Sequence, residues 1–115
     1  MTLFEAIQTH LVWKQRLSAL IKDGSNNGLE RVGDDTACPL GQWIQQKGEK
    51  YNDLEIFHRL HDEHLAFHRY AEAIVEAVDE HNNDKANEIM TKEFNVISRH
   101  IMRTMAGLSS TMEGI

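Results

Sequence analysis

The sequence predicts an all-α protein: an antiparallel four-helix bundle with three long helices and one short helix that carries the only cysteine. Apolar residues recur at helical spacing through most of the 115 residues. No stretch shows the alternation of apolar and polar residues that a half-buried strand requires. The length suits one domain, residues 1–115, built around a single core.

The first two helices are predicted from their end signals. Residues 2–22 repeat apolar groups on one face, and Thr2 with Glu5 has the form of a capping box. The turn-rich segment DGSNNGLERVGDD follows. A short helix is expected to begin near Pro39, a residue favoured at a first helical position, and to run to Lys47, with Gly48 ending it.

Two further long helices are predicted in the second half of the chain. The third helix is expected from residue 52 or 53 to about residue 81, and the last helix from about 85 to 112. Residues 82–84, Asn-Asn-Asp, are expected to form a tight turn between them. Met102, Met105, Leu108 and Met112 are expected to leave apolar surface near the C-terminus that a second copy could cover.

Charge and composition restrict the function. The net charge of −6 argues against nucleic acid or an anionic membrane surface as a partner. No apolar run approaches the roughly 18 residues that span a bilayer, and a secretory signal is not evident. With Cys38 as the only cysteine, no intrachain disulfide can form. We therefore expect a cytoplasmic protein whose thiol is buried, metal-bound or reactive.

Histidines stand where apolar residues are expected. The inward stripe of the third helix is predicted to hold three of them, in the series Phe57, His61, His64, His68, Ala71, Val75 and Val78. His64 and His68 have the i,i+4 spacing at which two imidazoles can bind one metal ion. Hydrogen-bonded core histidines are an equally good interpretation of this pair taken alone.

Two other residues favour a metal site. His10 lies on the apolar stripe of the first helix, so a second helix also directs an imidazole inward. Cys38 stands near the start of the short helix, where a helix N-terminus favours thiolate. Three nitrogens and one sulfur suit tetrahedral Zn²⁺ and leave no open position for a substrate water.

Three motifs in order carry a family resemblance: "HLVWK" from His10, "CPLGQW" from Cys38 and "HLAFH" from His64. The sequence resembles the chemoreceptor zinc-binding (CZB) domain of bacterial cytoplasmic chemoreceptors and diguanylate cyclases, also found as a stand-alone protein. The resemblance implies that the zinc ligands are His10, Cys38, His64 and His68. It also implies that Leu40 and Trp43 pack the short helix onto the bundle.

The resemblance implies a sensory or regulatory zinc domain rather than an enzyme. Its thiolate would respond to zinc level or to oxidants such as hypochlorous acid. A homodimer is implied, and a chemoreceptor, diguanylate cyclase or other signalling protein is the expected partner. The output remains open, as does whether the chain is a stand-alone protein or an excised domain. His61 lies one turn before His64 on the same stripe and could compete as a ligand, but His64 is favoured because it forms the i,i+4 pair with His68. The role of His61 remains open.

Two alternatives remain. The zinc could be purely structural, in a bundle that acts as a protein-interaction module. The chain could also be a hemerythrin-like di-iron protein, another histidine-rich helical bundle. A di-iron site needs carboxylates on the inner faces, one turn from its histidines, and among the histidines expected to face inward only His68, with Glu72, offers this spacing. The sequence therefore ranks the di-iron alternative last.

Overall fold

The computed structural model describes residues 3–24, 32 and 39–113. These residues form five helices and, within the described ranges, no strand. The helices are α1 (Leu3–Asp23), α2 (Pro39–Tyr51), α3 (Glu55–Asp79), α4 (Asn83–Thr91) and α5 (Glu93–Glu113). The predicted all-α class is confirmed.

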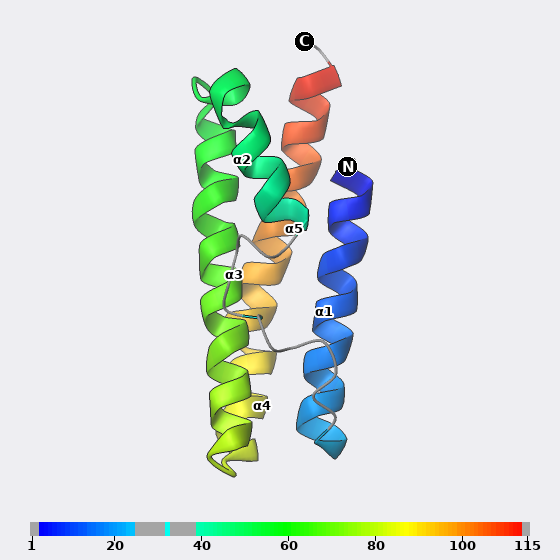
Figure 1. Cartoon of the computed structure of the whole chain (residues 1–115), viewed down its shortest axis with the longest axis vertical. Helices are drawn as coiled ribbons and strands as arrows, with labels where there is room; N and C mark the ends of the chain where they lie inside the picture. Colours follow the sequence, from blue (N-terminus) through cyan, green and yellow to red (C-terminus); the bar gives the residue numbers. More distant parts are fainter. Residues whose placement is uncertain (1–2, 25–31, 33–38, 114–115) are drawn as a thin grey trace.

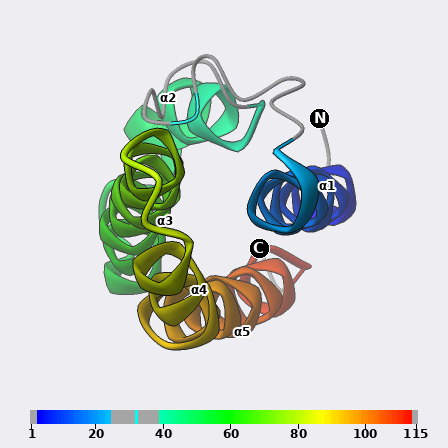
Figure 2. The ribbon, with the colours of Figure 1, turned by 90° about the horizontal axis from the view of Figure 1, so that it is seen from below.

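The helices form an elongated bundle of 48 × 22 × 18 Å. In Figure 1 the chain descends along α1 and α3 and ascends along α2 and then along α4 and α5. Seen along the long axis in Figure 2, α2, α3, α4 and α5 form an arc, and α1 lies at its open side. Because α1 contacts each of the other four helices, its inner face closes the core.

The inner face of α3 differs from the predicted stripe. Its buried residues are Phe57, Leu60, His64, Phe67, His68, Ala71, Ile74 and Ala77. His61 is exposed, and Val75 and Val78 are only partly buried. Steps of three and four residues define two overlapping stripes on one helix, and the tertiary neighbours decide which is buried. The expectation of a core-facing His61 is therefore wrong.

Helix α2 extends past its predicted end. Gly48 lies within the helix, which continues to Tyr51. Tyr51 is buried, and its ring centroid lies 6.5 Å from that of Trp43 and 6.1 Å from that of Phe57. This aromatic packing offsets the modest cost of a helical glycine, about 1 kcal/mol. Leu40 and Trp43 are both buried, which confirms that they pack the helix onto the bundle.

The junction between α3 and α4 is a hydrogen-bonded C-terminal cap. The His81 N–H donates to the Val78 carbonyl and the Asn82 N–H to the Ala77 carbonyl, the pattern of a Schellman motif. His81 has φ 59°, in the left-handed region. The Asn82 side chain then accepts from the Lys85 N–H at the start of α4. The turn thus lies at residues 80–82, and residues 83 and 84, predicted as turn, begin α4.

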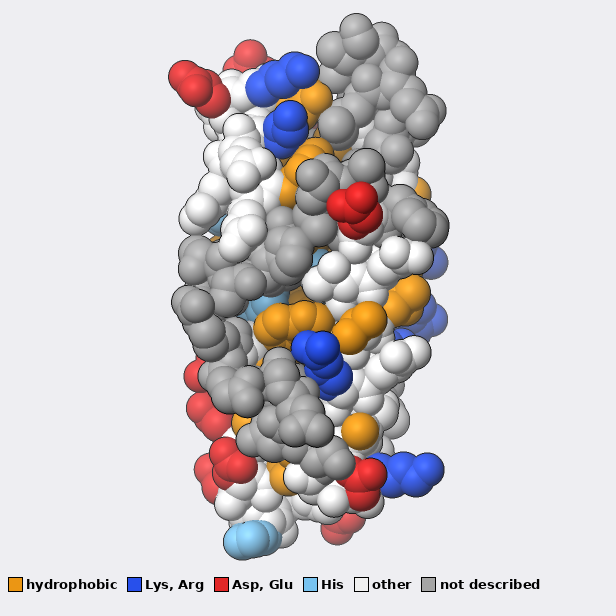
Figure 3. All heavy atoms as spheres, turned by 45° about the vertical axis from the view of Figure 1, so that its right-hand side comes forward, with side chains coloured by type: hydrophobic (Ala, Val, Ile, Leu, Met, Phe, Trp, Pro, Cys, Tyr) orange, Lys and Arg blue, Asp and Glu red, His pale blue; other side chains and the backbone are white. Residues whose placement is uncertain are grey.

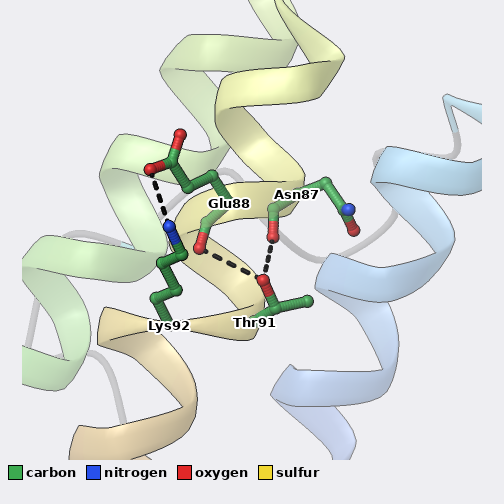
Figure 4. A network of polar contacts seen from close by, with 4 residues as sticks. All are labelled: Asn87, Glu88, Thr91 and Lys92. Atoms are coloured by element: carbon green, nitrogen blue, oxygen red, sulfur yellow. Dashed lines mark hydrogen bonds and ion pairs between the residues drawn. The ribbon is translucent and has the colours of Figure 1, made fainter.

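The predicted last helix is divided at Lys92, between α4 and α5. The Thr91 hydroxyl donates to the carbonyl oxygens of Asn87 (2.9 Å) and Glu88 (3.3 Å), and Lys92 Nζ donates to Glu88 Oε1 (Figure 4). A threonine hydroxyl bonded to the preceding turn bends a helix. Lys92 leaves helical geometry with ψ −92°. The prediction of one continuous helix over 85–112 is therefore wrong.

None of the described helices combines the length and the apolar character that crossing a membrane requires.

Candidate metal centre

Three histidines from two helices converge in the core. His10 comes from α1, and His64 and His68 come from consecutive turns of α3. One ring nitrogen of each lies within 4.8 Å of those of the other two. The residues are only 5%, 1% and 1% exposed, respectively. The structure therefore brings together three of the four ligands that the sequence predicted, in a setting shielded from water.

The fourth predicted ligand, Cys38, lies outside the described residues. Helix α2 begins at the next residue, Pro39. Leu40 and Trp43 of its first turns are buried, at 0% and 4% exposure. The start of α2 is thus packed against the bundle that holds the three histidines.

Backbone contact fixes the proton position on His68. Its Nδ1 lies 2.6 Å from the carbonyl oxygen of Val32, and both groups are buried. A carbonyl oxygen can only accept, so Nδ1 carries the proton and Nε2 presents its lone pair. This arrangement is common for metal-binding histidines, whose second nitrogen donates to a carbonyl or carboxylate.

The lone pair of His68 faces His64. The two Nε2 atoms are 2.9 Å apart, and because His68 presents its lone pair, His64 supplies the proton of this hydrogen bond. Tetrahedral zinc with Zn–N bonds of 2.0–2.1 Å separates two ligand nitrogens by about 3.3 Å. A movement of roughly 0.4 Å, within the freedom of two side chains, would let both lone pairs meet one ion. The pair therefore fits a metal.

Electrostatics keep His64 neutral. Burial, followed by the neighbouring His68, His10 and His61, lowers the pKa of His64 from 6.5 to about 2. An imidazole must be neutral to bind a metal, because the proton occupies the lone pair that the metal would use. At physiological pH His64 is thus neutral, which is the charge state that metal binding requires.

Aromatic rings hold the imidazoles in place. The His10 ring packs edge-on against Phe67, with centroids 4.5 Å apart, and Trp13 packs edge-on against His68 at 5.2 Å. Trp13 is the aromatic residue of "HLVWK". The sequence did not identify Val32 or Phe67 as residues that support the site. Phe67 had a weak signal, since it adjoins His68, whereas Val32 acts through its backbone and leaves no side-chain signal.

The remaining histidines lie outside the cluster. The side chain of His61 is 49% exposed, and its Nδ1 lies 3.7 Å from Asp62 Oδ1. His58 is exposed, and its Nε2 lies 2.6 Å from the carbonyl oxygen of Asn52. His81 and His100 are also exposed. The structure thus places His64, and not His61, beside His68 and His10.

Among the residues that the structure describes, no carboxylate joins the three histidines. Over residues 3–24, 32 and 39–113, the compact group of possible ligands consists of imidazoles alone. Glu72, the one carboxylate with suitable spacing from His68, is exposed. The described part of the centre therefore offers the nitrogen donors that suit zinc and lacks the bridging carboxylates of a di-iron site.

Comparison with known proteins identifies the family. The chemoreceptor zinc-binding domain matches residues 10–75, which is more than half of the chain. The match begins at His10 and extends past His64 and His68. The protein therefore belongs to the chemoreceptor zinc-binding domain family, as the sequence motifs predicted. No curated protein and no solved structure matches the chain.

Proposed function

We propose that this protein is a zinc-binding regulatory domain of bacterial signal transduction, with His10, Cys38, His64 and His68 as ligands of one Zn²⁺. The observation that supports it most is the convergence of three buried imidazoles within 4.8 Å, in a chain of a zinc-binding family. Three nitrogens and one thiolate complete a tetrahedral site. Because such a site is closed to substrate, we propose that the domain is not an enzyme.

Metal content tests this assignment directly. The full chain, purified without chelator, is expected to carry about one zinc per chain. Native mass spectrometry combined with elemental analysis reports the metal and the oligomeric state together. Iron at about two atoms per chain would contradict the proposal and support the hemerythrin-like alternative.

Cys38 is proposed both to bind the zinc and to start the response when its sulfur is oxidised. Bound zinc would keep its thiolate deprotonated and therefore nucleophilic. Oxidation of that sulfur to sulfenic acid would weaken one of the four ligands. Since α2 begins directly after Cys38, loss of this ligand is expected to loosen the start of α2 against the bundle. A partner that contacts α2 would then detect oxidant or zinc level.

Oxidation experiments separate this sensor from a structural zinc. Mild hypochlorous acid is expected to modify Cys38 before the five methionines and to release zinc. Hydrogen exchange should then increase in α2 while α1 and α3 stay protected. Peptide mass spectrometry locates the modification, and Cys38→Ser controls for methionine oxidation. Oxidation of methionine first, or unfolding of the whole bundle, would support a purely structural zinc instead.

A homodimer is proposed from family membership, and one expected basis for it is wrong. Met105 and Leu108 are fully buried within their own chain, and Met102 is partly buried, so these three do not provide the expected apolar surface; the side chain of Met112 lies outside the described residues. Leu11 and Val12 on α1 are 46% and 41% exposed. Figure 3 shows hydrophobic side chains reaching the surface on this side of the molecule. Polar substitution of both residues should shift a dimer toward monomer in sedimentation velocity.

The proposed setting is the bacterial cytoplasm, where the domain would act on a chemoreceptor, a diguanylate cyclase or another signalling protein. The net charge of −6 supports a protein partner over nucleic acid or an anionic membrane. Co-purification of a tagged chain with each candidate, with and without zinc, tests this proposal. Zinc-dependent retention of one candidate would support it.

A further inference from the structure

A surface groove lies on the outer face between α3 and α5, away from the histidine cluster. Three adjoining clefts, with volumes of about 410, 150 and 250 Å³, share His100 as a common wall. Together they form one groove, which we call the α3–α5 groove. From Glu93 to Thr104 it follows twelve residues of α5, which are eleven steps of 1.5 Å, or about 16 Å.

One end of the α3–α5 groove is apolar. Tyr70 from α3 and Val96 and Ile97 from α5 line its largest cleft. Tyr70 is 37% and Val96 44% exposed, which places them among the most exposed large hydrophobic residues of the described chain. Exposed apolar side chains that line a concave surface are typical of binding sites.

The other end is basic. Arg59 from α3 lines it together with Arg99 and Arg103, which lie one turn apart on α5. All three are exposed, and in the part of the chain that the structure describes, none of them forms an ion pair. Glu63 also lines this end, and its carboxylate accepts a hydrogen bond from the Thr104 hydroxyl, so this end carries three guanidinium groups against one carboxylate. The three guanidinium groups therefore face solvent together, on a chain of net charge −6.

We propose that the α3–α5 groove binds an acidic amphipathic helix of a partner protein. A helix of about three turns matches the length of the groove. Its apolar stripe would cover Tyr70, Val96 and Ile97, and its carboxylates would pair with the arginines, whose planar groups bind carboxylates through two hydrogen bonds. A nucleic acid or a free phosphate would use the arginines but leave the apolar end without a role. The proposal does not depend on the metal centre.

Designed peptides test the proposal on the full zinc-loaded chain. One helical probe carries leucines at i, i+4 and i+7 with glutamates beside them. A second replaces the glutamates with lysine, and a third replaces the leucines with serine. We expect the first probe to bind at least about tenfold more tightly than either of the others in fluorescence anisotropy, and its binding to weaken with salt.

Variants of the groove complete the test. Arg99→Glu with Arg103→Glu should weaken binding of the acidic probe about tenfold or more, and Val96→Ser should weaken it too. Arg16→Glu serves as the control. It makes the same charge change at one position on α1, outside the groove, and should not alter binding of the acidic probe. Circular dichroism and zinc content confirm that each variant is folded.

Four results would overturn the proposal. Equal binding of the acidic and basic probes, or no binding of any probe, removes the charge argument. If the serine probe binds as tightly as the first probe and inorganic phosphate competes with it, the groove is a simple anion site. A wild-type dimer that becomes monomeric in Arg99→Glu/Arg103→Glu, measured by sedimentation, assigns the groove to a second copy of the chain.

Discussion

His68 donates its Nδ1 proton to the backbone carbonyl oxygen of Val32 across 2.6 Å, in the buried interior of the bundle. This hydrogen bond ties α3 to Val32, which lies between α1 and α2 in the sequence. It also directs the Nε2 lone pair of His68 toward His64, 2.9 Å away. The backbone of one segment thus orients a histidine of another for metal binding.

The first prediction concerns this proton. His68 should be protonated at Nδ1 and not at Nε2, both in the zinc-free and in the zinc-loaded protein, because the Val32 carbonyl cannot donate. Long-range ¹H–¹⁵N correlation spectra of the histidine rings report the tautomer. The exposed His61 serves as an internal reference and should not change its tautomer when zinc is added. Protonation of His68 at Nε2 in either state would contradict the structure.

The second prediction compares two histidines one turn apart. His64→Ala should lower zinc affinity by more than about 100-fold, since it removes a buried nitrogen that faces His68 and His10. His61→Ala should change it little, because that side chain is 49% exposed and outside the cluster. Competition with a chromogenic zinc chelator measures both. Equal losses would show that His61 is a ligand or supports one.

The third prediction concerns acid and the zinc-free protein. In the unfolded chain His64 takes up a proton below its ordinary pKa of 6.5, whereas in the folded chain burial lowers that pKa to about 2. Protons therefore favour the unfolded state between these values, and stability falls as pH falls. The slope approaches about 1.4 kcal/mol per pH unit, so the free energy of unfolding should decrease by about 1.3 kcal/mol between about pH 7 and about pH 5.5.

Urea unfolding at the two pH values measures this decrease. The His64→Leu variant removes the titrating group but still fills the core. Its free energy of unfolding should therefore decrease by about 1.3 kcal/mol less between the two pH values. His61→Gln should retain the full decrease, because its side chain is exposed. A decrease of the same size in the leucine variant would show that other groups cause it.

The periodicity of apolar residues predicted well which segments are helical. The local end signals predicted less accurately where those helices end. The pattern placed α1 and α3 within a few residues because each has a long apolar face. Gly48 was a misleading end signal, since the packing of Tyr51 on Trp43 continues α2 past it. The division at Lys92 involves neither glycine nor proline. It accompanies hydrogen bonds of the Thr91 hydroxyl, which the sequence pattern does not specify.

In the candidate site, too, helical spacing could be predicted from the sequence, whereas contacts that depend on tertiary packing could not. The i,i+4 pair of His64 and His68 could be predicted because a helix fixes that geometry from sequence alone. His10 could be predicted to point inward, but its approach to α3 depends on the packing of two helices. The exposure of His61 was missed, because Phe57 starts a stripe through Leu60 as well as one through His61. The role of Val32 could not be predicted, since any residue supplies a carbonyl.

The last prediction concerns the turn between α3 and α4. His81 holds φ 59° at the C-terminal cap of α3, a conformation that costs a residue with a Cβ about 1 kcal/mol or more and costs glycine little. Its N–H donates to the Val78 carbonyl, and glycine can form the same bond. His81→Gly should therefore stabilise the protein by about 0.5–1 kcal/mol, measured by urea unfolding with zinc saturating. His81→Ala keeps the Cβ and should not give this gain. Zinc affinity should be unchanged in both variants, because His81 is exposed and outside the histidine cluster. Equal stability of the glycine and alanine variants would show that the turn does not hold His81 in the left-handed conformation in solution.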